Sequence, residues 1–291
     1  MSSLKSWIEA MRLRTLPVSV AGVICAVGFN ISDGSFLIVP AALCLVFAVL
    51  CQIASNFANE YFDYSAGRDR SGREGPRRGV TEGDISPRAM KTAVFATLAA
   101  AAIVGLSLTL WGGYWLIAAG IAVGLGALAY SAGPYPLSTH CLGEVAVIVF
   151  FGIVPVNLTY YVQALAWSPS VFAASVAIGL MGANVLIVNN VRDIPDDRAV
   201  GKHTLATAFG VRPMVVLYVV NAIAAALLTI NVWLGASDMW SAVPGLYVGL
   251  SVIIALRMAS LKGRRLTPLL GITAMLMLVF SVLMTSALSV G

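Results

Sequence analysis

Long apolar stretches, separated by short polar connections, follow one another along almost the whole chain of 291 residues. A helix needs about 20 predominantly apolar residues to cross the hydrocarbon core of a bilayer. The stretches here have about that length, so the pattern predicts an all-α, polytopic membrane protein with nine transmembrane helices. The expected spans cover approximately residues 16–33, 36–60, 90–111, 114–131, 143–162, 169–191, 213–234, 240–256 and 267–288.

The composition agrees with this class, because 59% of the residues are hydrophobic and only 11% are charged. Soluble domains have about 25% charged residues. Ahead of the first span, residues 1–14 form a short amphipathic segment. We expect this segment to lie in the membrane interface, although a simple positively charged anchor explains the same residues equally well.

The distribution of positive charge predicts the orientation in the membrane. With nine spans, the N-terminus and the connections after the second, fourth, sixth and eighth spans share one side, and all 18 Lys and Arg residues lie there. Cytoplasmic connections collect Lys and Arg, so we expect a multi-pass protein of the cell inner (cytoplasmic) membrane with a cytoplasmic N-terminus. Because topology accounts for the net charge of +5, we expect membrane lipids and an anionic substrate as partners, and no nucleic acid.

Two clusters of asparagine and aspartate lie at the expected cytoplasmic ends of the second and sixth spans. The first comprises Asn56, Asn59, Asp63 and Asp69, and the second comprises Asn189, Asn190, Asp193 and Asp197. Helical positions three, four and seven apart share a face, so each cluster forms a stripe. A carboxylate near the bilayer is costly unless it faces a cavity, a partner or a metal. We therefore expect both stripes to face one central cavity that opens to the cytoplasm.

The connections after the two clusters complete this expected site. Gly67 is suited to end the first helix, and Pro195 disfavours a helical residue before it. We therefore expect active-site loops at 64–89 and 192–212, with Asp69 and Asp197 on or just past the helix ends.

Carboxylate and amide oxygens are the ligands that Mg²⁺ prefers, and Mg²⁺ often joins a few carboxylates to substrate phosphates. Cations from the same connections could neutralise the remaining phosphate oxygens. Carboxylates for a metal beside cations for phosphate indicate a diphosphate ligand. The candidate cations are Arg68, Arg73, Arg77, Arg78, Arg192, Arg198 and Lys202.

Several segments of the chain resemble those of a known family. Its segments 56–63, with Asp69, and 189–197 are similar to the two aspartate-rich motifs of the UbiA superfamily of intramembrane prenyltransferases. Four further segments resemble signatures of the 1,4-dihydroxy-2-naphthoate polyprenyltransferase branch of that superfamily. These are Arg12–Pro17, Gly75–Gly79, Tyr130–Leu137 and Gly201–Leu205.

The resemblance implies a single transmembrane prenyltransferase domain over residues 1–291 and a Mg²⁺-dependent reaction. A polyprenyl group passes from polyprenyl diphosphate to 1,4-dihydroxy-2-naphthoate, with loss of CO₂ and diphosphate, and gives demethylmenaquinone. Within the superfamily, 4-hydroxybenzoate, homogentisate or a chlorin is the alternative acceptor. From a different class, an ion-coupled secondary transporter also places carboxylates near helix breaks, but around a site near the bilayer midplane.

The resemblance also implies roles for single residues. The expected metal ligands are Asp63, Asp69, Asp193, Asp197 and Asn59. The expected catalytic residues are Asp63, Asp193, Lys202 and Tyr130. The expected substrate-binding residues are Asn56, Asn59, Arg14, Arg73, Arg77, Arg78, Asn189, Asn190, Arg192 and Glu144.

Two departures from the superfamily pattern affect these roles. The spacing from Asp63 to Asp69 is longer than the usual four residues. Other branches place a lysine where this chain has Pro134. We therefore expect Lys202, Arg78 and Arg14 to supply contacts to the diphosphate.

Overall fold

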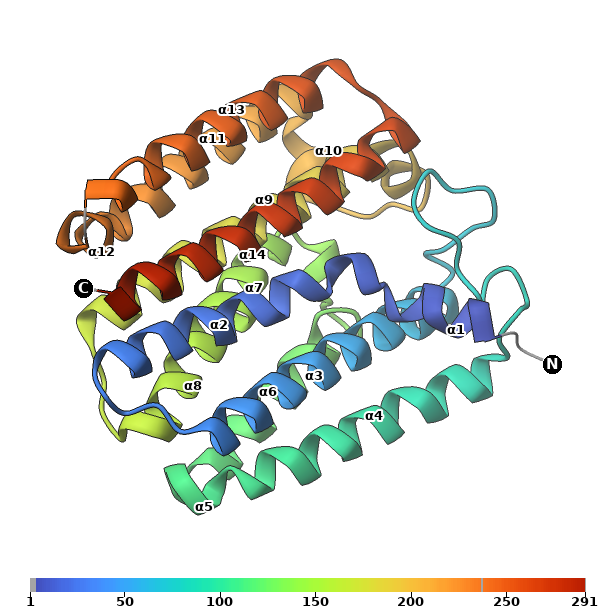
Figure 1. Cartoon of the computed structure of the whole chain (residues 1–291). Coiled ribbons are helices and arrows are strands. Elements are labelled where there is room, and N and C mark those ends of the chain that lie inside the picture. The colour runs from blue at the N-terminus through green and yellow to red at the C-terminus, as the bar shows by residue number, and fades with distance from the viewer. Residues whose placement is uncertain (1–3, 237, 291) are drawn as a thin grey trace.

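The computed structural model describes residues 4–236 and 238–290, and over these residues it is a bundle of helices with no strand beyond an isolated bridge between His140 and His203 (Figure 1). A π-helical segment, Ile148–Ile153, joins α7 to α8. The α-helices are α1 Leu4–Met11, α2 Leu16–Ser32, α3 Ile38–Ser65, α4 Pro87–Ser107, α5 Thr109–Gly112, α6 Leu116–Ala129, α7 Gly143–Val147, α8 Val154–Ala164, α9 Pro169–Ala199, α10 Leu205–Phe209, α11 Val211–Leu228, α12 Ile230–Gly235, α13 Val243–Ser260 and α14 Thr267–Val290.

Eight helical segments in the described part of the chain are long and apolar enough to cross a membrane. They are Leu4–Ser32, Ile38–Ser65, Pro87–Gly112, Gly143–Ala164, Pro169–Ala199, Val211–Leu228, Asp238–Ser260 and Gly263–Val290. The expected fourth span corresponds to α6, which has only 14 residues. At 1.5 Å per residue α6 is about 21 Å long, shorter than the roughly 30 Å hydrocarbon core. The all-helical membrane class is thus confirmed, whereas the count of nine full-length spans is not.

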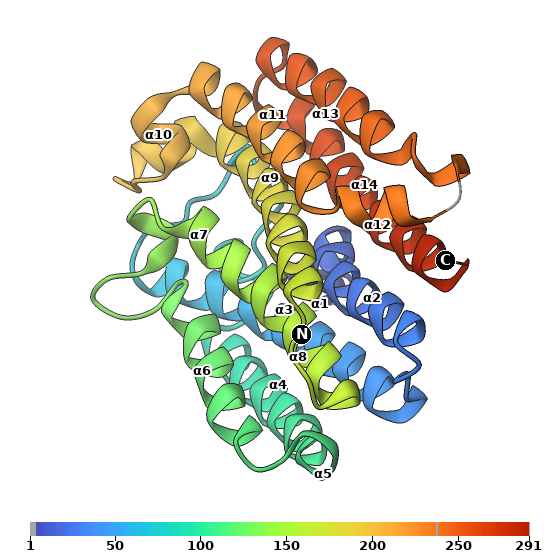
Figure 2. The same ribbon diagram turned by 90° about the vertical axis from the view of Figure 1, so that its left-hand side faces the viewer.

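The helix α9 runs through the middle of the bundle and contacts α2, α7, α8, α10, α11 and α14 (Figure 2). It is the most buried of the eight candidate spans. The π-helical segment packs directly on it, and a Cβ atom added to Gly152 would lie only 2.4 Å from the Cα of Gly179. Small residues allow backbones to approach in this way inside a membrane protein. These contacts fix the orientation of α9 and of the polar residues at its end.

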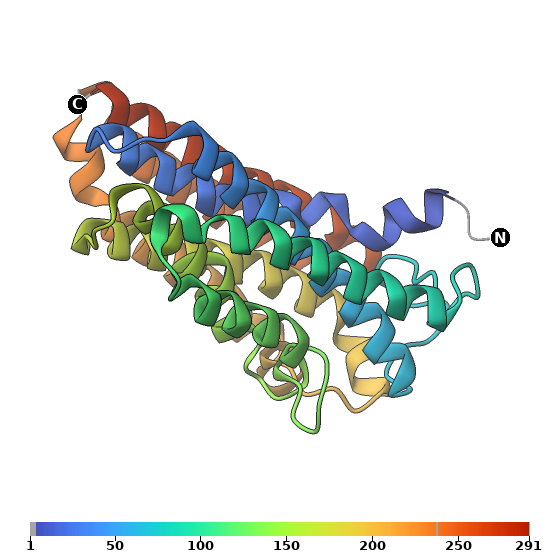
Figure 3. The same cartoon turned by 90° about the horizontal axis from the view of Figure 1, so that it is seen from below.

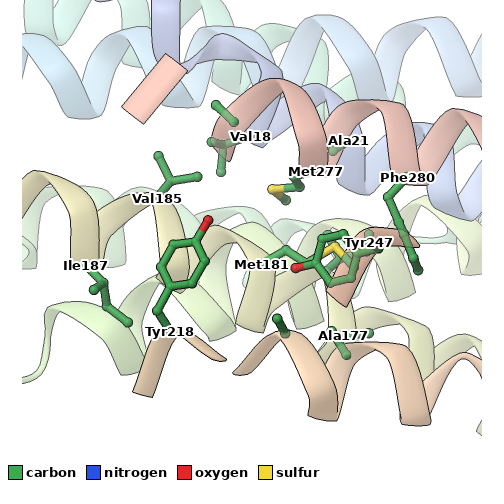
Figure 4. Packing of buried hydrophobic residues seen from close by; sticks show 14 of the residues in the cluster. Val18, Ala21, Ala177, Met181, Val185, Ile187, Tyr218, Tyr247, Met277 and Phe280 are labelled. Carbon is green, nitrogen blue, oxygen red and sulfur yellow. The ribbon is translucent and has the colours of Figure 1, made fainter. Parts of the chain in front are cut away.

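The largest apolar core lies between α2, α9, α11, α13 and α14 (Figure 4). Met181 of α9, Tyr218 of α11, Tyr247 of α13 and Met277 of α14 are all buried in it. A polar contact reinforces the α9–α11 packing, because Asn184 Nδ2 donates to the Tyr218 carbonyl at 2.9 Å. This half of the bundle supports α9 from the side opposite α3.

The end of α9 differs from the expectation. Pro195 does not break the helix, which continues through it for more than another turn. A proline removes one backbone hydrogen bond, but side-chain contacts hold the last turn in place. Asp196 accepts a hydrogen bond from the Glu74 backbone nitrogen at 2.6 Å and pairs with Arg70 at 2.6 Å. Asp197 therefore lies in the final helical turns and not in a loop.

The two expected active-site loops also differ from each other. The α3–α4 connection begins, as expected, at Gly67, which has a left-handed φ of 66°, and it remains irregular as far as Pro87. The expected loop 192–212 is largely helical, because it contains the end of α9 and all of α10. Both connections lie at the end of the bundle that carries α1, whereas α14 ends at the other (Figures 1 and 3).

Candidate active site

The carboxylates of the two motifs come together at the α1 end of the bundle. Asp63 of α3 and Asp193 of α9 are each only 3% exposed. Arg73, from the α3–α4 connection, lies between the motifs. Its Nη1 donates to Asp69 Oδ1 at 3.1 Å and its Nη2 donates to Asp193 Oδ2 at 3.1 Å. A cation thus joins the two acidic clusters, although Arg73 and Asp193 are 120 residues apart in the sequence.

Two more guanidinium groups meet at Asn59. Arg78 Nη2 and Arg12 Nη2 donate to Asn59 Oδ1 at 2.8 and 3.0 Å. Arg78 also lies 3.8 Å from Asp63 and 3.4 Å from Asp69. Asn59 Nδ2 donates to Ser131 Oγ at 3.0 Å, which connects α3 to the end of α6.

The electrostatics around these arginines are unequal. Burial opposes the charge of Arg73, but the carboxylates of Asp193 and Asp69 outweigh it and raise the pKa of the Arg73 guanidinium. Burial, together with the neighbouring charge of Arg73, lowers the pKa of Arg78. The acids around Arg78 therefore do not fully balance the positive charge near it, and an anionic ligand would supply the missing negative charge.

The second motif has its own set of contacts. Arg192 Nε donates to Asp193 Oδ1 at 2.7 Å, and Arg192 Nη2 donates to Asn189 Oδ1 at 2.7 Å. Asn190 Nδ2 donates to Glu144 Oε1 at 2.9 Å, so it faces α7. These bonds place the polar side chains of α9 around a shared space.

That space is a polar cavity lined by both motifs, and we call it the polar chamber. Its walls include Arg12, Asn56, Asn59, Arg73, Arg78, Asn189, Asn190, Arg192, Asp193, Asp197 and Lys202. Lys202 Nζ lies 3.9 Å from Asp197 Oδ1. The chamber thus collects five cationic side chains around two aspartates, Asp193 and Asp197, a charge balance that favours an anionic ligand.

A second, apolar cavity adjoins the chamber, and we call it the apolar tunnel. Its walls come mainly from α2, α3, α6, the π-helical segment and α8. It extends along α6 from Tyr130 to Leu116, which is about 21 Å at the helical rise. The residues that line both cavities are Gln52, Ser55, Tyr130 and Phe151. A ligand can therefore place an anionic head in the chamber and an apolar tail in the tunnel.

A family model described as the UbiA prenyltransferase family matches residues 16–282, which include every residue that lines the chamber and the tunnel except Arg12 and Thr15. The chain belongs to the UbiA prenyltransferase family.

Within the UbiA family, this chain is similar to enzymes that share one name. The 1,4-dihydroxy-2-naphthoate octaprenyltransferase of Mycobacterium tuberculosis is 37% identical over 297 residues, which is 100% of this chain and 99% of that protein. The enzyme of the same name from Escherichia coli is 35% identical over 216 residues, which is 72% of this chain and 70% of that protein. A solved UbiA homolog from Archaeoglobus fulgidus, bound to DMAPP and Mg²⁺, has the same fold, with a TM-score of 0.70 at 18% identity and coverage of 97% of this chain and 99% of that one.

The donor atoms of this UbiA-family site fit a hard divalent cation with a diphosphate. The acids offer only oxygen, and Asp63 Oδ1 is buried without a hydrogen-bond partner. Buried nitrogens of Arg73 and Arg78 also have no partner. Over the described residues, no three His, Cys, Asp or Glu side chains are close enough to hold an ion, and Arg73 lies between the carboxylates of Asp69 and Asp193. A buried carboxylate oxygen without a partner, beside guanidinium nitrogens without one, suits Mg²⁺ and a diphosphate together.

The structure brings most of the expected site residues together, with two exceptions. Arg14 is exposed and lines neither cavity, and Arg12 occupies the position expected of it. Arg77 is also exposed and pairs with Asp84 at 2.9 Å. Tyr130 lies at the junction of the cavities, as its expected role requires. Glu144 contacts the chamber only through Asn190.

Sequence reasoning missed three contributors. Arg12 was within reach, because it belongs to the segment that resembles the family. Its left-handed φ of 53° turns its side chain into the site, and nothing in the sequence indicates that conformation. Ser131 lies in the segment Tyr130–Leu137 but carries no charge that singles it out, and Gln52 lies in none of the motifs.

Proposed function

We propose that this protein is an aromatic polyprenyltransferase that uses polyprenyl diphosphate and 1,4-dihydroxy-2-naphthoate. The products are diphosphate, CO₂ and the prenylated naphthoquinol, which is the reduced form of demethylmenaquinone. The observation that carries this proposal is the continuity of a cationic chamber with an apolar tunnel in one UbiA-family chain. The names of the two similar enzymes support the naphthoate as acceptor.

The chamber binds the head of the donor. Arg73, Arg78 and Lys202 would contact its phosphate oxygens, since each borders the chamber and each now pairs with an acid that a metal can share. Negative charge grows on the diphosphate as the carbon–oxygen bond breaks, so fixed cations stabilise the transition state more than the ground state.

Magnesium is proposed as the metal of this site, held by Asp63, Asp69, Asp193 and Asp197 with Asn59 near them. Bound Mg²⁺ supplies Lewis-acid stabilisation of the leaving diphosphate. Arg73 would then leave the carboxylates and pair with the phosphates. Asp63 and Asp193 would hold the metal beside the chamber that binds the leaving group.

The tunnel binds the prenyl tail and excludes water. Departure of the diphosphate leaves an allylic cation, which water would convert into a prenol. Phe151 and Tyr130 lie where the tunnel meets the chamber, and their ring faces can stabilise a nearby cation. The apolar walls beyond them keep bulk water from the reacting carbon.

The electron-rich naphthoate ring then attacks the allylic carbon from the chamber side. A ring carbon bonds to the allylic carbon, and the bond to the carboxylate breaks, which releases CO₂ and leaves its electron pair with the ring. Arg12 and Arg192 line the chamber and would pair with the carboxylate of the bound naphthoate. We further propose that the chamber opens to the cytoplasm of a cell whose inner membrane holds the protein, because all the Lys and Arg residues belong to the connections expected on that side.

An acceptor comparison tests this function. Purified protein is given Mg²⁺, a polyprenyl diphosphate and either 1,4-dihydroxy-2-naphthoate or 4-hydroxybenzoate, and kcat/KM is measured for each by mass spectrometry. We expect a prenylated, decarboxylated product from the naphthoate and a far lower rate with the benzoate. Product from 4-hydroxybenzoate alone would keep the prenyltransferase chemistry and reject the naphthoate as acceptor.

A further inference from the structure

Gln52 of α3 is an uncharged side chain at the junction of the polar chamber and the apolar tunnel, and it lines both. It is 7% exposed, and its Oε1 is buried with no hydrogen-bond partner. Buried polar atoms are nearly always paired, so an unpaired one calls for an explanation. In the proposed function, the diphosphate and its metal would pair with the unpaired atoms of the arginines and of Asp63. The amide oxygen of Gln52 needs a different partner, because it can only accept a hydrogen bond.

The neighbours of Gln52 fix which way its amide points. Gln52 Nε2 donates to Thr15 Oγ1 at 3.4 Å. The hydroxyl hydrogen of Thr15 is already donated to the Arg12 carbonyl at 2.9 Å. Thr15 can therefore only accept from Gln52, which keeps the amide nitrogen on the Thr15 side and turns Oε1 away from it.

The missing partner is a hydrogen-bond donor, and a bound substrate can supply one. The polyprenyl diphosphate offers none, because its head carries acceptor oxygens and its tail is hydrocarbon. The aromatic acceptor carries two hydroxyl groups. Its 1-hydroxyl lies beside the carboxylate and forms an internal hydrogen bond, as in salicylate, so only the 4-hydroxyl has a free hydrogen.

We propose that Gln52 is a specificity-determining residue whose Oε1 accepts a hydrogen bond from the 4-hydroxyl of the dihydroxynaphthoate. This inference rests on the proposed function and adds the residue that recognises the hydroxyl. The contact holds the naphthoate ring where the chamber meets the tunnel, next to the allylic carbon of the prenyl donor. The carboxylate of the naphthoate then faces the arginines of the chamber.

The same contact favours the reaction. As the ring attacks the allylic carbon it gains positive charge, and its hydroxyl becomes a stronger donor. The hydrogen bond to Gln52 therefore strengthens in the transition state, which raises kcat as well as affinity. Loss of the Gln52 oxygen should lower kcat with dihydroxynaphthoate, while the KM for the prenyl donor changes by less than about twofold.

Binding of three acceptor analogues tests the assignment. With Mg²⁺ and farnesyl thiodiphosphate present, dissociation constants are measured for 2-naphthoate, 1-hydroxy-2-naphthoate and 4-hydroxy-2-naphthoate. In the unmodified protein we expect the 4-hydroxy analogue to bind about tenfold more tightly than 2-naphthoate, and the 1-hydroxy analogue to gain little. In Gln52→Met, which keeps the side-chain volume, this tenfold preference should disappear.

Two further variants complete the experiment. Gln52→Asn keeps the amide but withdraws it by one methylene, so it should lose the preference as well, and it decides the matter if Gln52→Met does not fold. Gln163→Met is the matched control. Gln163 is a buried glutamine of α8 whose amide is fully engaged with Asn30, Thr159 and Leu37, so its loss disturbs packing without changing the preference for the 4-hydroxyl.

The outcomes separate this inference from the proposed function. A folded Gln52 variant that keeps the tenfold preference would overturn the inference and indicate that a water molecule meets Oε1. An unmodified protein that does not convert dihydroxynaphthoate would instead reject the proposed function, whatever the binding ratios.

Discussion

At the scale of single residues, the site depends on cations that lie between acids. Arg73 bridges Asp69 and Asp193, and Arg78 approaches Asp63. Buried charges of this kind are costly unless they are paired, so each acid depends on its arginine partner, and in the proposed function a metal and a diphosphate would replace these contacts. The acids and the arginines therefore act as one unit.

Removal of either central acid should stop the reaction. Asp63→Asn and Asp193→Asn keep the volume of the side chain but remove a proposed metal ligand and its charge. We expect the initial rate of prenyl transfer to fall roughly 100-fold or more, measured by product formation at saturating substrates. A normal rate in either variant, with an unchanged elution profile in detergent, would contradict its assignment as a metal ligand.

Two arginines of one connection provide a matched comparison. Arg73→Ala removes a side chain of the chamber, and we expect kcat/KM for the prenyl donor to fall roughly 100-fold. Arg77→Ala removes an exposed side chain that pairs with Asp84, and exposed pairs contribute at most about 1 kcal/mol, so its kinetics should stay close to normal. Equal losses in the two variants would show that general positive charge, and not the position of Arg73, matters.

Residues that carry charge in a motif could be predicted from the sequence, because membrane burial of an acid is rarely tolerated without a function. Arg12 shows the limit. It lies two positions from Arg14, and only the left-handed backbone at Arg12 decides which of the two enters the site. Gln52 shows another limit, since its unpaired oxygen becomes visible only when its neighbours are placed around it.

At the scale of elements, apolar length predicted the spans well because each span must satisfy its backbone within the membrane. The prediction failed where tertiary contacts replace local preferences. Pro195 should end a helix, yet Asp196 fastens the following turn to the α3–α4 connection. The π-helical turn before α8 was not predicted either, although it places Phe150 and Phe151 on the tunnel wall.

The packing of α6 against this π-helical turn makes the tunnel sensitive to one methyl group. A Cβ atom at Gly126 would lie 2.2 Å from Phe150 Cζ, so Gly126→Ala must push the ring away, and the tunnel is the open space beside it. We expect a lower kcat/KM for prenyl donors, measured across a series of chain lengths.

Gly124, two residues before Gly126 on the same helix, provides the control for Gly126→Ala. Gly124 has no atom within 4 Å of an added Cβ and does not line the tunnel. Gly124→Ala should leave donor use unchanged and favour the helix by up to about 1 kcal/mol. If both alanine variants impair donor use equally, the Phe150 contact does not control the tunnel.

At the scale of the whole molecule, the fold gathers its polar chemistry at one end. The chamber, α1 and the long connections share that end, while the opposite end holds the short α2–α3 and α8–α9 turns (Figure 1). An amphiphilic donor suits this plan, because its tail can stay in the apolar part of the protein while its head remains at the polar surface.

The proposed orientation can be tested with single cysteines at the two ends. In a Cys141→Ser background, Ser71→Cys lies in the α3–α4 connection and Ser170→Cys lies at the start of α9, and both positions are exposed. A membrane-impermeant maleimide is applied to cells under conditions in which it reaches only the outer face of the inner membrane. It should label position 170 and spare position 71. The reverse pattern would contradict a cytoplasmic chamber.

The chamber and the tunnel together are proposed to transfer a prenyl group to dihydroxynaphthoate with the help of a divalent metal. The most direct measurement is mass spectrometry of the products formed by purified protein from a polyprenyl diphosphate and 1,4-dihydroxy-2-naphthoate, with Mg²⁺ and then with EDTA. We expect a prenylated, decarboxylated naphthoquinol that disappears with EDTA and returns with added Mg²⁺. Absence of that product with Mg²⁺ present, or its undiminished formation in EDTA, would contradict it.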